Sequence, residues 1–484
     1  MKFLILCENS NGSQPYMHYR QMGAFELKRR IKKHGHEGTI LEWFTHWKEE
    51  DLIRTAKTYF KDTDQPVIAV STPFGYKDLY AIESFLSWAK KEFQNIKIIH
   101  GGNRTYQDNF KNIIDVFFLG RSMEIFDRWI SNQDISKYVV NKRPLVLINQ
   151  NFDEKIDQPV LPDLDEDNCF TSRDILGFEV GVGCKFNCTF CNYELRGAKI
   201  TKFLDPKELH NYFDLAQKKY GITHFYTSDD TINESDEKLE VILEAIEGLD
   251  YKPKITSFAR LDMFSSRKQQ LDMIEKIQFA ALFFGIESFN PKASKLIRKK
   301  TGLDDNFETL KEIKKRCPNT YTIGSLIAGL VGDSKEHMIQ SIERVIEEKL
   351  LWGLQVYPLN IASSSAVVDD YFLSDLDKNP EKFGYKTTMP IGMLPSNKDS
   401  TVMHWESDWS DTDHANELHR EINEKYADDL VLMNHFEYAG FQSLGLVKPG
   451  KKIVYNTLKH KAFGVSMQLK HQYILNKMKY LGVQ

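Results

Sequence analysis

The sequence predicts an α/β protein in which two parallel-sheet domains are followed by a mostly helical C-terminal region. Two observations support this prediction: short apolar runs alternate with helical segments twice along the chain, and a polar, proline-containing segment separates the two series. We assign residues 1–140 to a doubly wound domain, 141–171 to a linker, 172–365 to a partial (β/α)6 barrel and 366–484 to the C-terminal region.

The first series predicts a doubly wound parallel sheet of the flavodoxin or Rossmann type. Such sheets bind ligands beyond the C-terminal ends of their strands, here after Cys7, after Val70 and at Gly101 and Gly102. The expected strands are KFLILC (2–7), TILEW (39–43), VIAVSTP (67–73), KIIHGG (97–102) and VFFLG (116–120), and the expected helices cover residues 22–34, 48–61, 78–93 and 122–132.

Residues 133–171 show no hydrophobic periodicity. They contain the acidic run DLDED and three prolines, at positions 144, 159 and 162. We interpret the segment as a connector between domains, and an irregular edge of either neighbour is the alternative.

The second series predicts a partial parallel barrel. One helix between its first two strands carries Leu209, Tyr212, Phe213 and Ala216 at i, i+3, i+4 and i+7, which gives it one apolar face. Barrels of this type place their chemistry at the C-terminal strand ends. The expected strands are FEVGVG (178–183), ITHFYTSD (222–229), KITSFARL (254–261), FAALFFGIES (279–288), TYTIGSLIAGL (320–330) and LQVYPLNI (354–361).

Bulk composition argues against several classes of protein. Hydrophobic residues make up 41% of the 484 residues, charged residues 27%, and the formal net charge is −4. These values favour a folded chain and do not favour nucleic acid as a partner. The apolar start MKFLILC is typical of a first strand rather than a signal peptide, and no apolar stretch is long enough to span a membrane. We therefore expect a cytoplasmic protein with no membrane partner.

Three of the six cysteines lie in the stretch GCKFNCTFCNY (183–193), as Cys184, Cys188 and Cys191. Such crowding without a secretory signal favours metal binding or catalysis over disulfides. A structural zinc site needs four ligands, and no second CxxC or HxxxH lies nearby, although Cys169 or His210 could be recruited. An iron-sulfur cluster held by three thiolates instead leaves one iron open to a substrate or cosubstrate.

The pattern formed by Cys184, Cys188, Phe190 and Cys191, on the loop after the first barrel strand, resembles the CxxxCx(aromatic)C signature of the radical S-adenosylmethionine (SAM) superfamily. The resemblance implies that Cys184, Cys188 and Cys191 hold a [4Fe-4S] cluster whose open iron is chelated by SAM, and that Phe190 is among the residues that contact SAM. It also implies cleavage of SAM to a 5′-deoxyadenosyl radical that abstracts hydrogen from an unactivated carbon. An electron donor such as flavodoxin or ferredoxin would be required, and the substrate would be a small molecule or a modified biomolecule.

Further residues resemble the family's SAM contacts. Asp229 and Asp230 follow the second strand, where the family binds the SAM amino group, and their alternative role is a helix N-cap. Glu287 and Ser288 end the fourth strand within GIES; the carboxylate would bind the ribose diol or would be a solvated end charge. Arg260 ends the third strand and would bind substrate or the SAM carboxylate, or would form a plain salt bridge.

Gly329 begins the stretch GLVGD, which resembles the family's GLPGE stretch. A glycine there would let the backbone approach the adenine closely, and a simple turn is the alternative.

The order of parts resembles the class of radical SAM enzymes with a cobalamin-binding domain, over about residues 1–360. Three segments resemble parts of that domain. Its first helix resembles MGAFELKRRIKKHGHE (22–37), its GG loop resembles IIHGGN (98–103), and the following corner resembles VFFLGRSME (116–124). Cobalamin domains that supply an axial histidine do so from a DxHxxG segment after the first strand. This chain reads CENSNGS (7–13) at that position and has no histidine there. We expect His18, the nearest histidine, to begin the first helix.

If cobalamin binds, it would contact the C-terminal edge of the first sheet, where we expect Ser71, Thr72, Gly101 and Gly102. The alternatives are a domain that keeps the fold without the cofactor and, for the two glycines, a tight turn.

The resulting hypothesis is cobalamin-dependent C-methylation, with no catalytic residue assigned. The alternatives are a cobalamin-independent radical SAM rearrangement, cyclisation or oxidation, and a zinc-stabilised binding module without enzymatic activity. We expect the C-terminal region to form a lid or substrate wall. Its residues His404, Trp405, Trp409 and His414 would line a pocket or form a packing cluster with surface histidines, and we favour the cluster.

Overall fold

The structure is a computed structural model of the chain. It describes residues 1–8, 18–72, 77–102, 108–149, 158–193, 195–198, 200, 202–299, 303–364, 373–394, 397–427, 433–450 and 453–483. Most of the CENSNGS segment (from residue 9 on) and residues 150–157 of the expected linker lie outside these described residues.

The N-terminal domain is a doubly wound sheet, as predicted. Its seven strands lie in the order β2-β1-β3-β4-β5-β7-β6, and all neighbouring pairs are parallel except β6 and β7. The strands are β1 Lys2–Cys7, β2 Glu37–Glu42, β3 Pro66–Ser71, β4 Lys97–Gly102, β5 Val116–Leu119, β6 Val139–Lys142 and β7 Leu145–Ile148; the helices are α1 Met22–Lys33, α2 Glu49–Tyr59, α3 Lys77–Ala81, α4 Glu83–Glu92 and α5 Met123–Ile130.

Three details of this domain differ from the sequence-based expectations. The segment interpreted as an irregular connector contributes β6 and β7 to the sheet edge. The single helix expected over 78–93 is divided at Ile82 into α3 and α4. His18 does not begin the first helix, which starts at Met22; its ring is buried and its Nε2 lies 3.2 Å from the carbonyl oxygen of Ser466.

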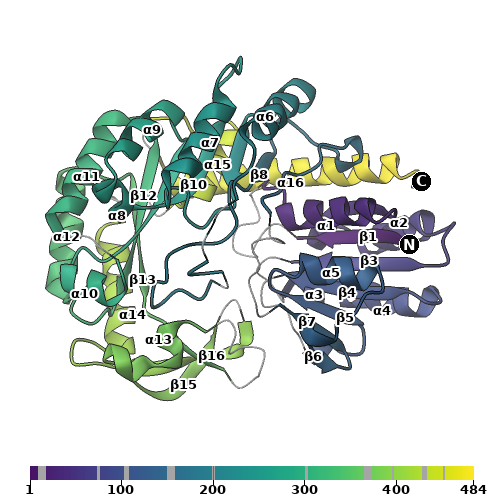
Figure 1. The fold of residues 1–484 in the computed structure, drawn as a ribbon, viewed down its shortest axis with the longest axis horizontal. Helices are drawn as coiled ribbons and strands as arrows, with labels where there is room; N and C mark the ends of the chain where they lie inside the picture. Colours follow the sequence, from purple (N-terminus) through teal and green to yellow (C-terminus); the bar gives the residue numbers. More distant parts are fainter. Residues whose placement is uncertain are drawn as a thin grey trace.

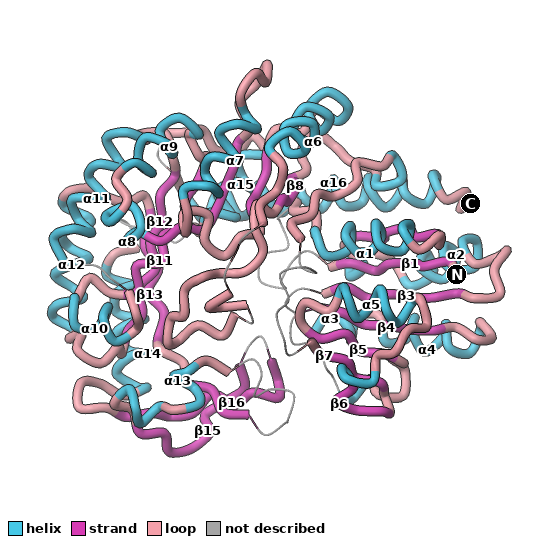
Figure 2. The backbone as a smooth tube through the Cα atoms, viewed as in Figure 1, coloured by secondary structure: helices cyan, strands magenta, loops and turns pink. Residues whose placement is uncertain are grey.

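The second domain is the predicted partial barrel of six parallel strands in sequential order, β8 to β13, wrapped on the outside by helices (Figure 2). The first strand ends at Phe178, so the expected strand FEVGVG is mostly loop. The apolar face of α6 is confirmed, because its four predicted residues are all buried. The strands are β8 Ile175–Phe178, β9 His224–Thr227, β10 Lys254–Arg260, β11 Ala281–Glu287, β12 Tyr321–Ala328 and β13 Gly353–Pro358; the helices are α6 Pro206–Tyr220, α7 Asp236–Ile246, α8 Leu261–Ser266, α9 Gln269–Ile277, α10 Pro291–Leu296, α11 Leu303–Arg316 and α12 Lys335–Glu347.

The C-terminal region is helical but also contains a three-stranded antiparallel sheet, in the order β14-β16-β15. Helix α15 packs against barrel strands, with the rings of His435 and Phe258 4.3 Å apart. Helix α16 crosses from the barrel to the N-terminal domain (Figure 1). The elements are β14 Ile361–Ser364, α13 Asp375–Lys378, β15 Lys386–Leu394, β16 Asn397–Glu406, α14 Thr412–Lys425, α15 His435–Ser443 and α16 Tyr455–Tyr480.

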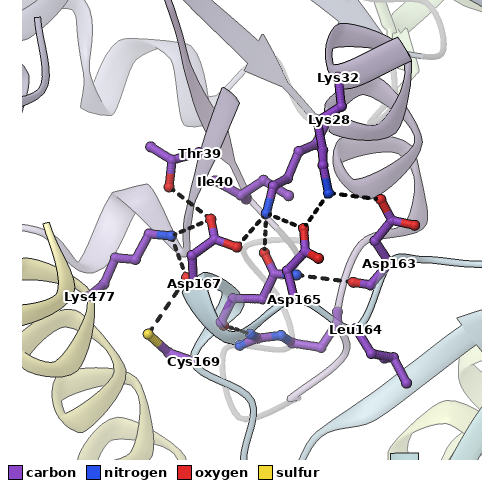
Figure 3. Close-up of polar contacts among 12 residues, drawn as sticks. Lys28, Lys32, Thr39, Ile40, Asp163, Leu164, Asp165, Asp167, Cys169 and Lys477 are labelled. Atoms are coloured by element: carbon purple, nitrogen blue, oxygen red, sulfur yellow. Dashed lines mark hydrogen bonds and ion pairs between the residues drawn. The ribbon is translucent and has the colours of Figure 1, made fainter. Parts of the chain in front are cut away.

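The acidic run of the expected linker anchors α16 to the first helix. Lys477 of α16 is fully buried and donates to the backbone carbonyl of Asp167, while Lys28 of α1 pairs with the Asp167 carboxylate (Figure 3). Lys28 also pairs with Asp165 at 3.1 Å, and Thr39 of β2 donates to Asp167 at 3.2 Å. The N-terminal domain, the acidic run and the C-terminal helix therefore share one polar junction.

A second buried lysine of α16 makes stability depend on pH. Lys470 is fully buried, its Nζ lies 3.1 Å from Nε2 of His46, and its ammonium lies over the ring of Trp43. Burial lowers the pKa of Lys470 from its ordinary 10.5 to about 8, although the nearby carboxylate of Glu8 acts in the opposite direction.

Between pH 8 and 10.5 the unfolded chain keeps a proton at Lys470 that the folded chain has lost, so this site makes folding more favourable as pH rises. We expect the unfolding free energy of the wild type, relative to the Lys470→Met variant, to increase by about 1 kcal/mol from pH 7 to pH 9. Denaturant titrations at the two pH values measure the difference. The exposed Lys479 of the same helix is the control, and a Lys479→Met comparison that changed equally with pH would contradict the assignment.

Candidate active site

The C-terminal strand ends of the two parallel sheets point toward each other (Figure 1). Arg121, just after β5, donates two hydrogen bonds of 3.2 Å to the carboxylate of Glu179, just after β8. Glu179 is buried, and its burial raises the pKa of the carboxyl group, while Arg121 favours the charged form. The two edges at which sheets of these types bind ligands thus meet at one ion pair.

The predicted cysteine loop follows β8 directly. Cys188 is buried, and Cys184 and Cys191 are half-buried. Burial raises the pKa of Cys184 to about 12 and that of Cys191 to about 11, so these two free thiols are protonated at neutral pH. Binding of a metal cluster through these residues therefore releases protons.

A buried triad of charges fixes the start of this loop. Asp229 accepts hydrogen bonds from the backbone N–H groups of Val180 at 2.8 Å and Gly181 at 3.0 Å. Lys238 of α7 lies 2.6 Å from Asp229 and 2.7 Å from Glu234, and all three side chains are buried. Glu234 in turn accepts from the backbone of Lys185 at 3.0 Å. We call Asp229, Glu234 and Lys238 the loop triad.

The two aspartates after β9 therefore occupy different environments. Both carboxylate oxygens of Asp229 are used within the protein, whereas Asp230 has an exposed side chain. The protein around Asp230 still desolvates it and raises its pKa to about 7, with repulsion from Asp229 and Glu179 adding to the effect and a hydrogen bond from Tyr193 opposing it. The N-cap alternative is wrong, because α7 begins at Asp236 with Ser235 as its N-cap.

Arg260, at the end of β10, forms the salt bridge that was one of its expected roles. Its guanidinium donates to Asp262 at 2.9 and 2.6 Å. The remaining Nη1 lies 3.1 Å from Sγ of Cys188, so the arginine contacts the cysteine loop directly.

Glu287 and Ser288 lie at the end of β11, as predicted. Glu287 is buried, pairs with Lys299 at 3.1 Å and accepts from Ser325 at 3.1 Å, so its reading as a solvated end charge is wrong. Its φ of 65° is uncommon for a residue other than glycine, and such strained backbone is found preferentially at functional sites. The hydroxyl of Ser288 donates to Asp333 at 2.5 Å.

The loop that begins at Gly329 is held by the C-terminal region. The carbonyl oxygen of Gly329 accepts from the hydroxyl of Tyr385 at 3.0 Å, and that hydroxyl accepts from the backbone of Val331 at 2.9 Å. The fully buried ring of Trp405 packs on Gly329, which confirms the packing role expected for this tryptophan. Trp409, in contrast, is exposed, and His414 lies at the surface with 71% of its side chain exposed.

Alanine at Gly329 is expected to destabilise the fold by about 3 kcal/mol. The residue has φ of 96°, and an added Cβ would lie 2.5 Å from the ring of Trp405, so backbone strain and overpacking add. Gly248 is the matched control: its φ is 76° but a Cβ there has no atom within 4 Å, so Gly248→Ala is expected to cost only about 1 kcal/mol. Thermal unfolding of both variants measures the difference, and equal losses would contradict the packing argument.

The small residues predicted at the C-terminal edge of the N-terminal sheet are brought together. Ser71 and Gly101 are register partners on β3 and β4, and the hydroxyl of Thr72 lies 3.0 Å from Nε2 of His100. A Cβ added at Gly101 would meet its nearest atoms at 3.8 Å, so packing within the protein does not require glycine there. Gly102, with φ of 149°, ends the strand beside it.

Sequence reasoning missed the residues that connect these parts. Lys238 carried a local signal, because it shares the buried stripe of α7 with Ile242 and Ala245 at i+4 and i+7, where a charge is unexpected. Arg121 and Glu179 carried none, since their pairing depends on how two domains meet.

The cysteine loop fits a group bound through three thiolates. Two of the sulfurs face N–H donors: Cys188 faces Arg260, and Cys191 accepts from the backbone of Tyr193 at 3.4 Å. Among the described residues, no three or more His, Cys, Asp or Glu side chains are arranged around a point that would hold a single ion. A cubane binds its cysteines through different irons, so its ligands need not converge on one point.

Residues 178–345 match the family model of the Radical SAM superfamily. The chain therefore contains a radical SAM domain, which extends from the end of β8 into α12. No curated protein matches the chain significantly in sequence.

Solved structures share the fold over nearly the whole chain. The radical S-adenosylmethionine methyltransferase TsrM from Kitasatospora setae, solved with tryptophan substrate and a SAM analogue, has a TM-score of 0.62 at 12% identity, covering 99% of each chain. The cobalamin-dependent S-adenosylmethionine radical enzyme OxsB, solved with aqua-cobalamin, also has a TM-score of 0.62 at 12% identity, covering 99% of this chain and 80% of OxsB. At these identities the likeness concerns the fold.

None of the described helices combines the length and apolar character needed to cross a membrane.

Proposed function

We propose that this protein is a cobalamin-dependent radical SAM enzyme that methylates an unactivated carbon of a small molecule. The observation that carries the proposal is the position of the CxxxCxxC loop, which follows β8 of the radical SAM domain and faces the ligand-binding edge of the doubly wound sheet across the Arg121–Glu179 pair. The fold shared with TsrM and OxsB supports the assignment of cofactors, since the TsrM structure contains cobalamin and a [4Fe-4S] cluster.

In this proposal Cys184, Cys188 and Cys191 hold the [4Fe-4S] cluster, with Phe190 packed beside them against the hydrophobic core. When bound, the cluster supplies one electron to SAM and cobalamin supplies the transferred methyl group. The loop triad keeps the start of the cysteine loop in place by binding its backbone.

The residues proposed to bind SAM lie at the C-terminal ends of several barrel strands. The exposed Asp230 accepts hydrogen bonds from the SAM ammonium, a role that leaves Asp229 to hold the loop. Glu287 and Ser288, at the end of β11, bind the ribose hydroxyls. Gly329 lies in the loop that meets the adenine. Ser71, Thr72, Gly101 and Gly102 form the edge that binds cobalamin.

The proposal is tested by anaerobic reconstitution in the presence of a corrinoid, followed by cobalt analysis and mass spectrometry of the products formed from candidate substrates. We expect about one cobalt per chain and a product that is heavier by one methyl group. A product without an added methyl, made by protein without cobalt, would favour a cobalamin-independent rearrangement, cyclisation or oxidation. Colourless protein with equimolar zinc would overturn the enzyme class.

A further inference from the structure

Arg260 presents a positive charge to one of the three loop cysteines. Its Nη1 lies 3.1 Å from Sγ of Cys188, and its guanidinium lies 3.9 Å from the ring centroid of Phe186, a residue of the same loop. Arg260 is 5% exposed, so both contacts are made away from bulk water.

The arginine is held in this position from several sides. Asp262 occupies its Nε and Nη2 edge with hydrogen bonds of 2.9 and 2.6 Å. Asn233 binds both backbone polar groups of Arg260, accepting from its N–H at 2.8 Å and donating to its carbonyl at 2.9 Å. Gln270 donates to the carbonyl of Asn233 at 3.1 Å. The guanidinium is therefore fixed before any ligand binds.

This geometry does not suit a carboxylate receptor. An arginine binds a carboxylate best through two parallel N–H groups on one edge of the guanidinium. In Arg260 that edge is taken by Asp262, and Nη1 faces sulfur. The role expected from the sequence, binding the SAM carboxylate, would have to use the N–H groups at the end of the guanidinium that faces Cys188, because Asp262 occupies the Nε edge.

We propose that Arg260 raises the reduction potential of the cluster by stabilising negative charge on the sulfur of Cys188. This inference rests on the proposed function, because it requires a cluster on the cysteine loop. When a cluster accepts one electron from a reductant, negative charge on its ligand sulfurs increases, so an N–H donor and a nearby positive charge favour the reduced form. Asp262 acts in the opposite direction, because its negative charge lies beside the same guanidinium.

The test is an anaerobic redox titration of the reconstituted full-length protein with dithionite, without SAM, in which the reduced cluster is followed by electron paramagnetic resonance. At the wild-type midpoint, we expect Arg260→Gln to lower the ratio of reduced to oxidised cluster about tenfold, a shift of about 59 mV for one electron. Asp262→Asn is expected to raise this ratio, because it removes a negative charge and keeps the arginine.

The matched control is Arg344→Gln. Arg344 stacks on Phe307 at 4.0 Å, much as Arg260 stacks on Phe186, but Arg344 belongs to the outer helix α12 and Phe307 to the outer helix α11. Its substitution is expected to leave the ratio unchanged.

The two variants are expected to change the ratio of reduced to oxidised cluster in opposite directions, so each can contradict the proposal. If Arg260→Gln weakens SAM binding while the SAM-free ratio stays at the wild-type value, Arg260 is a SAM ligand and the proposal is overturned. If that variant does not retain a cluster, Asp262→Asn decides: a higher ratio supports the proposal and an unchanged ratio overturns it. A wild-type protein without iron and sulfide would instead contradict the proposed function.

Discussion

The Cys188→Ala variant is expected to lose the cluster and to cleave SAM at least about a thousandfold more slowly than the wild type, a loss of about 4 kcal/mol in transition-state stabilisation. Cys188 is the most enclosed of the three loop cysteines and the one that Arg260 contacts. Its removal leaves only two thiolates for a cluster that is expected to bind through three. Iron and sulfide content after anaerobic reconstitution and the rate of 5′-deoxyadenosine formation measure the effect.

The control for this prediction is Cys317→Ala. Cys317 is also buried, but it follows α11 on the outside of the barrel. Its replacement is expected to cost about 1 kcal/mol of stability and to leave the cluster intact. Cluster loss in both variants would show that the protein responds to cysteine removal in general, and the assignment of Cys188 as a ligand would fail.

The Lys238→Met variant is expected to destabilise the protein by about 3 to 5 kcal/mol, because it leaves Asp229 and Glu234 buried without their shared cation. The same change releases the start of the cysteine loop, so the cluster content should fall together with the thermal unfolding temperature. Adding Glu234→Gln to Lys238→Met is expected to recover part of the stability, since it removes one of the two buried negative charges.

The matched control is Lys335→Met, which removes another lysine paired with a glutamate. Lys335 and Glu421 lie 2.5 Å apart, but 49% and 39% of their side chains are exposed. Exposed pairs of this kind contribute little to stability, because water and salt screen the two charges. If Lys238→Met were as mild as Lys335→Met, the loop triad could not be the element that holds the loop.

The sequence was most informative where the determining pattern is local. The apolar stripe of α6 follows from the spacing of Leu209, Tyr212, Phe213 and Ala216. The cysteine loop is recognisable from the spacing of its three cysteines over eight residues, shortly after an apolar strand. Strand β7 was missed because its four apolar residues follow Pro144 and lie in a segment without periodicity, so they become recognisable only beside β5.

Pairings between distant residues were beyond the reach of the sequence. Arg260 and Cys188 are 72 residues apart, and Lys477 and Asp167 are 310 apart, so neither contact leaves a local pattern. The different environments of Asp229 and Asp230 have the same origin. Which of two adjacent carboxylates holds a loop and which remains accessible depends on the direction in which each points after the strand ends.

The central claim is that the three loop cysteines bind a cluster that delivers an electron to SAM. Anaerobically reconstituted wild-type protein is to be analysed for iron and sulfide, reduced with dithionite and incubated with SAM. We expect about four irons and four sulfides per chain, as a [4Fe-4S] cluster contains, together with release of 5′-deoxyadenosine. Protein that binds no iron and sulfide, or that carries the reduced cluster and leaves SAM intact, would contradict the claim.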